Sequence, residues 1–151
     1  MKIARSAPAS AAVALLLTGC GLTVPTDPEG TLDRVRNEGV IRVGVSPSPG
    51  WVELAGGGGL SGREPDLVED FAASLDVEVE WTVSGEEDLV TMLKEGEIDL
   101  AVGGFTEDNA WVDQVGLTRP YTDTHVMMVP MGENALQSEL ERWLDEYGGT
   151  S

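Results

Sequence analysis

The sequence predicts an α/β fold, in which helices cover both faces of a mostly parallel sheet and form a three-layer sandwich. Three strand-like segments, 40–45, 77–83 and 98–102, alternate with two segments of helical periodicity. The chain has 151 residues, which fits one domain. Because crossovers between parallel strands are right-handed, this alternating order predicts that the three strands run parallel.

The first strand is VIRVGV at 40–45, and the third is IDLAV at 98–102, which Gly103 and Gly104 end. A short helix over 32–38, which Thr31 can cap, precedes the first of them and ends at Gly39.

The second strand differs, because its side chains alternate between apolar and polar. Val77, Val79, Trp81 and Val83 point one way, and Glu78, Glu80 and Thr82 point the other. Such alternation is typical of an edge strand with one solvent-exposed face, so the first strand should lie between the second and the third. The order of connection then reverses between strands one and three, and ligands of such sheets bind beyond the carboxyl ends at that point. The loops that leave there are 46–62 and 103–114.

The helical segments carry apolar residues at intervals of three and four. One helix should start near Pro65, which suits a first helical position. Another should start from the capping-box pattern of Ser84 and Glu87 and stop at Gly96. Segments 115–118 and 125–129 read as further short strands. An amphipathic helix over 134–147 closes the chain.

The first nineteen residues do not belong to this fold. Lys2 and Arg5 precede an apolar run over 11–17, which is too short to span a bilayer as a helix and suits a signal peptide. The next residues, LTGC, end at Cys20 and resemble the lipobox of bacterial lipoproteins, which implies cleavage before this cysteine and lipid attachment to it. We therefore expect a signal peptide over 1–19, a flexible tether over 20–30 and a folded lobe over 31–151.

The charge of the chain restricts its partners. Without residues 1–19 the chain has 7 Lys and Arg against 27 Asp and Glu, a net charge of −20. Such a charge repels nucleic acid and anionic lipid headgroups, so we expect no nucleic-acid partner. The expected location is extracytoplasmic, in the periplasm or on the outer face of the cell membrane, with the membrane reached through the lipid.

Four motifs in order resemble the extracellular solute-binding proteins of bacterial family three. They are GVIRVGV at 39–45, GREPDL at 62–67, EGEIDL at 95–100 and TRPY at 118–121. The similarity covers about 31–147. It implies a lobe like that of periplasmic binding proteins and a receptor for a small polar or cationic, amino-acid-like solute. The implied partners are that solute and an ABC permease.

Two departures from the family pattern bear on function. The family has two lobes that close on a ligand, whereas here segment 125–129 follows Tyr121 after three residues, so the second lobe is missing. The family also places an arginine shortly after the threonine that follows strand three, and this arginine binds a ligand carboxylate. Segment 106–111, TEDNAW, has two acids and no arginine. Arg63 could replace that arginine from the start of the next helix, or it could be a solvated surface residue.

The candidate ligand-binding residues follow strands one and three; they are Trp51, Gly103, Gly104, Thr106 and Trp111. An aromatic residue in the first loop often stacks on ligand in the family, although Trp51 could instead cover the core. The two glycines could admit ligand to the backbone or merely end a strand, and Thr106 could bind ligand or only form a turn. Trp111 could offer an aromatic face to a cation.

No catalytic, metal or cofactor pattern emerges from the sequence. There is no nucleophile elbow, no phosphate loop and no metal-ligand spacing around His125, the single histidine. The expected function is therefore binding and not catalysis. Two alternatives remain: a reduced lipoprotein lobe that acts as an interaction module without transport, and two copies that face each other to rebuild a cleft.

Overall fold

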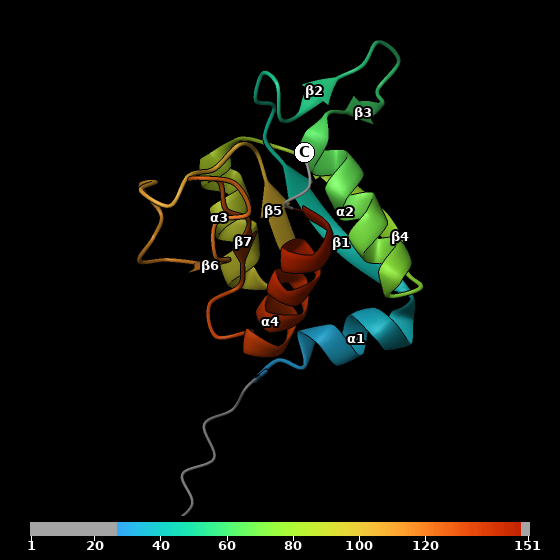
Figure 1. Ribbon diagram of the computed structural model, residues 1–151. Coiled ribbons are helices and arrows are strands. Elements are labelled where there is room, and N and C mark those ends of the chain that lie inside the picture. Colours follow the sequence, from blue (N-terminus) through green and yellow to red (C-terminus); the bar gives the residue numbers. More distant parts are fainter. Residues whose placement is uncertain (1–26, 149–151) are drawn as a thin grey trace, which may run out of the picture.

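The computed structural model describes residues 27–148, and its centre is a five-stranded sheet in the order β4-β1-β5-β7-β6 (Figure 1). The strands are β1 Val40–Val45, β4 Glu78–Val83, β5 Leu100–Val102, β6 Gly116–Leu117 and β7 Met128–Val129. β1 pairs in parallel with both β4 and β5, whereas β7 is antiparallel to β5 and β6. The predicted central place of the first strand, and with it the switch point between β1 and β5, is confirmed.

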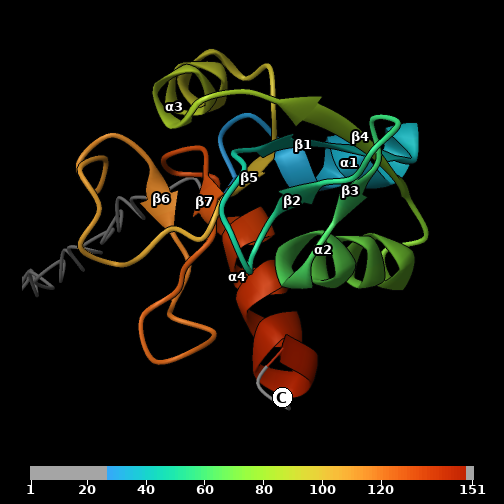
Figure 2. The ribbon, with the colours of Figure 1, turned by 90° about the horizontal axis from the view of Figure 1, so that it is seen from above.

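Helices cover both faces of this sheet, as predicted. They are α1 Thr31–Glu38, α2 Arg63–Ser74, α3 Glu86–Glu95 and α4 Asn134–Trp143, which continues as a π-helical turn, Leu144–Gly148. α3 lies on one face, and α2 and α4 lie on the other (Figure 2). Neighbouring strand residues accordingly enter different cores: Leu100 packs with the α2 and α4 side, and Ala101 packs with the α3 side. The three-layer α/β sandwich is confirmed.

Gly44 explains how closely α3 packs on the sheet. A Cβ atom at this position would lie 2.5 Å from Leu89 Cδ2 and 2.7 Å from Ile98 Cδ1. A glycine in a strand interior is otherwise unfavourable, and here it allows the close approach of a helix.

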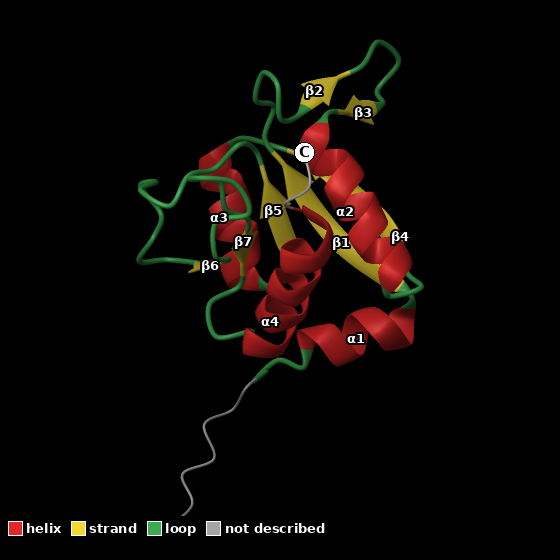
Figure 3. Ribbon diagram, in the orientation of Figure 1, coloured by secondary structure: helices red, strands yellow, loops and turns green. Residues whose placement is uncertain are grey.

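The long loop predicted over 46–62 contains a small hairpin that the sequence did not reveal. Its strands are β2 Glu53–Leu54 and β3 Leu60–Ser61, and they pair antiparallel to each other (Figure 3). The glycine run at 56–59 forms the turn, in which the Ala55 amide donates to the Gly59 carbonyl at 2.8 Å. Strands of two residues carry no measurable alternation, so periodicity could not find them.

Residues 27–30, which the sequence assigns to the tether, lie against the start of α4. The Glu133 carboxylate accepts hydrogen bonds from the backbone amides of Glu29 and Thr31, at 2.9 and 3.2 Å. The expected cap from Thr31 is wrong, because this residue is already helical and the carboxylate of Glu133 takes the cap's place. Cys20 and the rest of the predicted signal and tether lie outside the described residues. Within residues 27–148, no helix has the length and apolarity to cross a bilayer.

Candidate functional site

The carboxyl ends of β1 and β5 lie side by side, and the two predicted site loops leave from them. The Ser46 amide just after β1 donates to the Val102 carbonyl at the end of β5, at 3.0 Å. The hairpin β2–β3 and the start of α2 lie at this same edge, at the top of Figure 1. Residues from the segments 46–64, 103–109 and 121–125 therefore meet here. We refer to this place as the switch-point edge.

A buried carboxylate holds the turn that follows β5. The side chain of Glu64, in the first turn of α2, is fully buried. It accepts a hydrogen bond from the Tyr121 hydroxyl at 2.5 Å and another from the Gly104 amide at 2.8 Å. Burial raises the pKa of Glu64, and the hydrogen bonds from Tyr121, Gly104 and Gly103 partly oppose this rise. These hydrogen bonds tie the Gly103–Gly104 turn to α2.

Trp51 lies against this turn. A Cβ atom on Gly104 would come within 2.6 Å of Ser48 Oγ and 3.1 Å of the Trp51 ring, and Gly104 has a φ of +66°. Both the left-handed backbone and the close packing therefore require glycine. The ring of Trp51 also stacks on His125, with 3.8 Å between centroids and 27° between planes, and meets the edge of Tyr121 at 6.3 Å.

Thr106 and His125 join the second and third segments of the site. They form an isolated antiparallel bridge, and the Thr106 hydroxyl donates to Asp108 at 2.6 Å. His125 Nδ1 lies 2.9 Å from the Thr122 hydroxyl. Burial, followed by the positive charge of Arg63, lowers the pKa of His125, so the imidazole is neutral at pH 7.

Trp111 lies elsewhere. It is half-buried and packs against the core cluster beneath α3, which contains Leu89, Phe105 and Met128, whereas Trp51 packs against the cluster on the opposite face of the sheet. The Trp111 amide donates to Asn109 Oδ1 at 2.8 Å. The structure thus groups Trp51, Gly103, Gly104 and Thr106 and leaves Trp111 outside this group.

Four residues complete the site beyond those chosen from the sequence: Arg63, Glu64, Tyr121 and His125. Arg63 is half-buried, and its guanidinium carbon lies 5.5 Å from the centroid of Trp51. This position does not fit the solvated-surface alternative. Glu64 and Tyr121 lie in the motifs GREPDL and TRPY, so the signal for them was present in the sequence. Nothing local to His125 indicated its stacking partner.

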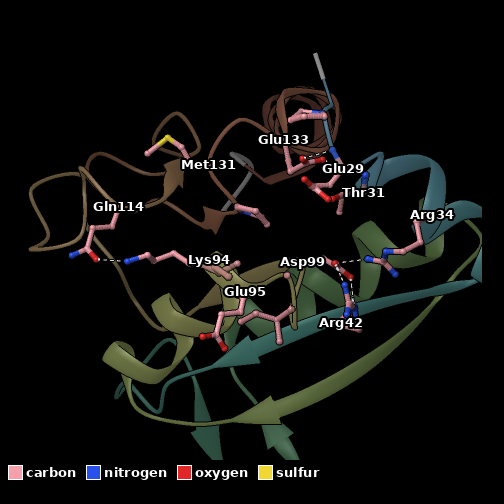
Figure 4. Close-up of a pocket in the computed structure, with 15 residues that line it drawn as sticks. Glu29, Thr31, Arg34, Arg42, Lys94, Glu95, Asp99, Gln114, Met131 and Glu133 are labelled. Atoms are coloured by element: carbon pink, nitrogen blue, oxygen red, sulfur yellow. Dashed lines mark hydrogen bonds and ion pairs between the residues drawn. The ribbon is translucent and has the colours of Figure 1, made fainter. Parts of the chain in front are cut away.

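A cavity among the described residues lies at the opposite end of the sheet. Its volume is about 790 Å³, and its wall includes residues at the amino ends of β1 and β5. In its wall the buried Asp99 accepts hydrogen bonds from Arg34 and from the backbone and side chain of Arg42 (Figure 4). A second cavity of about 310 Å³ adjoins the first site loop and is lined by Pro47, Ser48, Pro49, Val52, Glu53 and Leu54. The cavity beside the switch-point edge is thus the smaller of these two.

Open α/β sheets bind ligands beyond the carboxyl ends of their strands at such a switch point. Residues 41–147 match the bacterial extracellular solute-binding proteins, family 3, and the chain belongs to this family.

Solved structures of amino-acid-binding proteins share the fold. Domain 1 of TmArgBP, in the arginine-bound form of a Phe57Trp mutant, superposes with a TM-score of 0.73 at 22% identity, over 79% of this chain and 99% of that chain. An ancestral cationic amino acid solute-binding protein gives 0.72 at 13% identity, over 78% and 93%. The truncated arginine-bound ArgBP from T. maritima gives 0.55 at 26% identity, over 59% and 42%. The expected single-lobe architecture is therefore confirmed.

Curated relatives are longer proteins. Membrane-bound lytic murein transglycosylase F of Vibrio cholerae is 31% identical over 96 residues, which are 63% of this chain and 18% of the relative. A probable histidine-binding protein of Campylobacter jejuni is 26% identical over 81 residues, which are 54% of this chain and 32% of the relative. The chain thus spans between about a fifth and a third of these relatives.

Proposed function

We propose that this protein is an extracytoplasmic lipoprotein that binds an amino acid with a cationic side chain at the switch-point edge and serves as the receptor of an ABC importer. The observation that carries the proposal is the arrangement around Trp51. An aromatic ring, the Gly103–Gly104 backbone and the bridge between Thr106 and His125 meet where ligands of such sheets bind.

The charge of the protein supports a cationic ligand. The mature chain carries a net charge of −20, which raises the local concentration of cations and repels anions. Near the site, Glu107 and Asp108 are exposed, and Asp108 already accepts a hydrogen bond from Thr106. An α-ammonium group, a guanidinium or an imidazolium can bind such carboxylates.

The relatives support the same ligand class. The structural relatives include arginine-bound proteins, and one of them is a single domain in its arginine-bound form. A curated relative is described as histidine-binding. A single lobe that binds on its own would explain how this chain could function without the second lobe of the family pattern.

Isothermal titration calorimetry of the purified chain with L-arginine, L-lysine, L-histidine, L-glutamine and L-glutamate tests the proposal. We expect heat from the cationic amino acids and none from L-glutamate. Trp51→Ala should weaken binding by about 5- to 30-fold, because ring stacking on a cation contributes on the order of 1–2 kcal/mol. Trp111→Ala is the matched control, because the sequence suggested both tryptophans as ligand-binding residues and the structure places Trp111 away from the site. We expect it to lower stability but to leave affinity unchanged. Absence of heat with every amino acid would contradict the proposal.

Attachment to the membrane is proposed from the lipobox. In cells, the protein should incorporate labelled palmitate and sediment with membranes, and Cys20→Ala should abolish both. Equal membrane association of wild type and variant would contradict a lipid anchor on this cysteine.

A second candidate function is an interaction module without transport. The similarity to part of a membrane-bound murein transglycosylase favours it, because the chain matches less than a fifth of that protein. Titration with purified muropeptides separates the two candidates: binding of muropeptides in the absence of amino acid binding would favour a cell-wall module. Mass measurement by light scattering at increasing concentration, with and without L-arginine, tests whether two copies associate.

A further inference from the structure

We infer that Asp27 and Glu133 share one proton and form a clasp that fastens residues 27–31 to the start of α4, and that loss of this proton releases these residues. The clasp lies where the predicted tether, 20–30, meets the lobe. Its effect on how far the lobe reaches from a membrane rests on the lipid anchor of the proposed function, whereas the clasp itself does not.

Backbone amides of one turn point at the two carboxyl groups. The amides of Glu29 and Thr31 donate to the Glu133 carboxylate at 2.9 and 3.2 Å. The Leu32 amide donates to Asp27 Oδ2 at 3.3 Å. Because the Glu133 residue is only 1% exposed, these hydrogen bonds replace the water that its carboxylate loses on folding. The two side chains therefore hold the chain just before α1 and cap the start of this helix.

The second oxygen of Asp27 calls for a proton. Within residues 27–148, Asp27 Oδ1 is buried and has no partner as long as the group is ionised. Two ionised carboxylates cannot hydrogen-bond to each other, because neither has a proton to donate. A proton on Asp27 lets the pair bond, and burial, followed by this hydrogen bond, raises the pKa of Asp27 to about 6. Burial acts to raise the pKa of Glu133 too, but hydrogen bonds from Asp27 and the amides lower it, so Glu133 stays ionised.

Loss of the proton would place two negative charges side by side, and the surroundings do not offset them. Asp33 in α1 adds to the negative charge around Asp27. The cavity of about 790 Å³ adjoins the clasp, but the basic residues in its wall have other partners (Figure 4). The charged groups of that wall besides Glu133 are Glu29, Arg34, Arg42, Lys94, Glu95 and Asp99, of which Arg34 and Arg42 bind Asp99, and Lys94 donates to Gln114.

The release should be confined to the turn before α1. Leu32 and Val35 of α1 are buried in one core cluster with Leu136 and Leu140 of α4, and such apolar contacts do not titrate. When the clasp opens, residues 27–30 are added to the free length of the predicted tether, which gives the lobe at most about 14 Å of further reach. An acidic exterior would thus keep the lobe closer to its anchor than a neutral one.

Amide hydrogen exchange, followed by NMR on the purified chain, tests the clasp. The protection of the Glu29 and Thr31 amides, corrected for the intrinsic exchange rate at each pH, would be measured in wild type, Asp27→Asn and Asp70→Asn. Asn at position 27 can donate to Glu133 without titrating. Asp70→Asn removes an exposed carboxyl group from α2 and is the matched control. The amide of Val43, in the centre of the sheet, reports global unfolding.

In wild type and Asp70→Asn, the protection of Glu29 and Thr31 should fall by about 10-fold between pH 4.5 and pH 6.5, because opening releases one linked proton. It should stay below that of Val43 throughout, and in Asp27→Asn it should not fall. Protection that is independent of pH in wild type, or that falls equally in Asp27→Asn, would overturn the inference. Equal protection of Thr31 and Val43 would overturn it as well, because the turn would then open only by global unfolding. The purified chain needs no lipid for this measurement, so a failure of the proposed anchor at Cys20 would leave the clasp standing.

Discussion

The two ends of the sheet hold their buried carboxylates in different ways. At the amino ends of β1 and β5, Asp99 is neutralised by Arg34 and Arg42. At the carboxyl ends, Glu64 is held by a hydroxyl and backbone amides, while Arg63 lies over Trp51. The larger cavity belongs to the first end, where the acid and its two arginines already pair with one another. Our proposed binding site therefore rests on the arrangement of its side chains and not on cavity size.

Removal of the Asp99 carboxylate should have the largest effect on stability. Asp99→Ala leaves two arginines facing a buried position without their counter-charge, and loss of one partner of a buried pair costs about 3–5 kcal/mol. Urea unfolding measures this loss. Glu38→Gln removes only the exposed partner of Arg34 and should cost less than about 1 kcal/mol. Affinity for L-arginine in the folded fraction should be unchanged; a drop in affinity would contradict the separation of the two ends.

Tyr121→Phe should affect both stability and binding. It removes the hydroxyl donor from the buried Glu64, and an unsatisfied buried group costs about 1–3 kcal/mol. Because Glu64 also holds the Gly103–Gly104 turn, affinity for L-arginine should fall too. Tyr147→Phe, at an exposed tyrosine on the π-helical turn, is the control; because this residue lies at the surface, it should cost less stability than Tyr121→Phe and should leave affinity unchanged. Urea unfolding would measure stability and calorimetry would measure affinity for both variants. A loss of stability in Tyr121→Phe with unchanged affinity would mean that the turn does not depend on this hydroxyl.

Gly104→Ala and Gly58→Ala separate backbone strain from packing. Both glycines have positive φ values, +66° and +87°, but a Cβ atom meets Ser48 and Trp51 only at Gly104 and meets nothing within 4 Å at Gly58. Both variants should lose about 1 kcal/mol from strain, and Gly104→Ala should lose about 1 kcal/mol more from the clash. Gly104→Ala should also weaken ligand binding. Equal losses in urea unfolding would mean that Trp51 can move away from the turn without cost.

The smallest expected effect is on the pH dependence of stability, at a carboxyl group just before α1. Burial, and then the hydrogen bond with Glu133, raise the pKa of Asp27 to about 6 in the folded protein, from 3.8. The folded state therefore binds this proton more tightly than the unfolded state, and the stabilisation is present below about pH 4 and lost as pH rises through 6. After allowance for solvent screening, it is on the order of 1 kcal/mol.

Asp27→Asn cannot titrate and should gain stability relative to wild type between pH 4 and pH 6.5. The other carboxylates are common to both proteins, so the difference between their melting temperatures reports the titration of Asp27 together with Glu133, whose pKa the hydrogen bond with Asp27 lowers. If the melting temperatures of wild type and Asp27→Asn changed equally with pH over this range, the raised pKa of Asp27 would be refuted.

Most of the fold could be predicted from local patterns. The first strand was predicted over the same six residues that the structure shows. The alternation of polar and apolar residues in the second predicted strand correctly placed that strand at the edge of the sheet. The helix caps were less predictable, because Glu133 caps α1 from more than a hundred residues away. The short strands of the hairpin were missed since two residues have no period.

The site could be predicted only in part. The sequence located the two loops, and the structure groups four of the five residues chosen from them. Trp51 and Trp111 both follow central strands, but they pack on opposite faces of the sheet, which no local pattern distinguishes. Tyr121 and His125 reach the site from a third segment through contacts that are distant in sequence.

The sequence by itself determined the order of strands and helices, the position of the switch point in the sheet and the absence of an arginine from 106–111. Each of these depends on periodicity, chain order or composition, which can be read from the chain without knowing which distant residues come into contact. Only the tertiary structure decided that Arg63 lies over Trp51 and that Glu64 points inward to Tyr121. Adjacent residues on a helix point in different directions, about 100° apart, so their roles depend on what the rest of the fold places beside each of them.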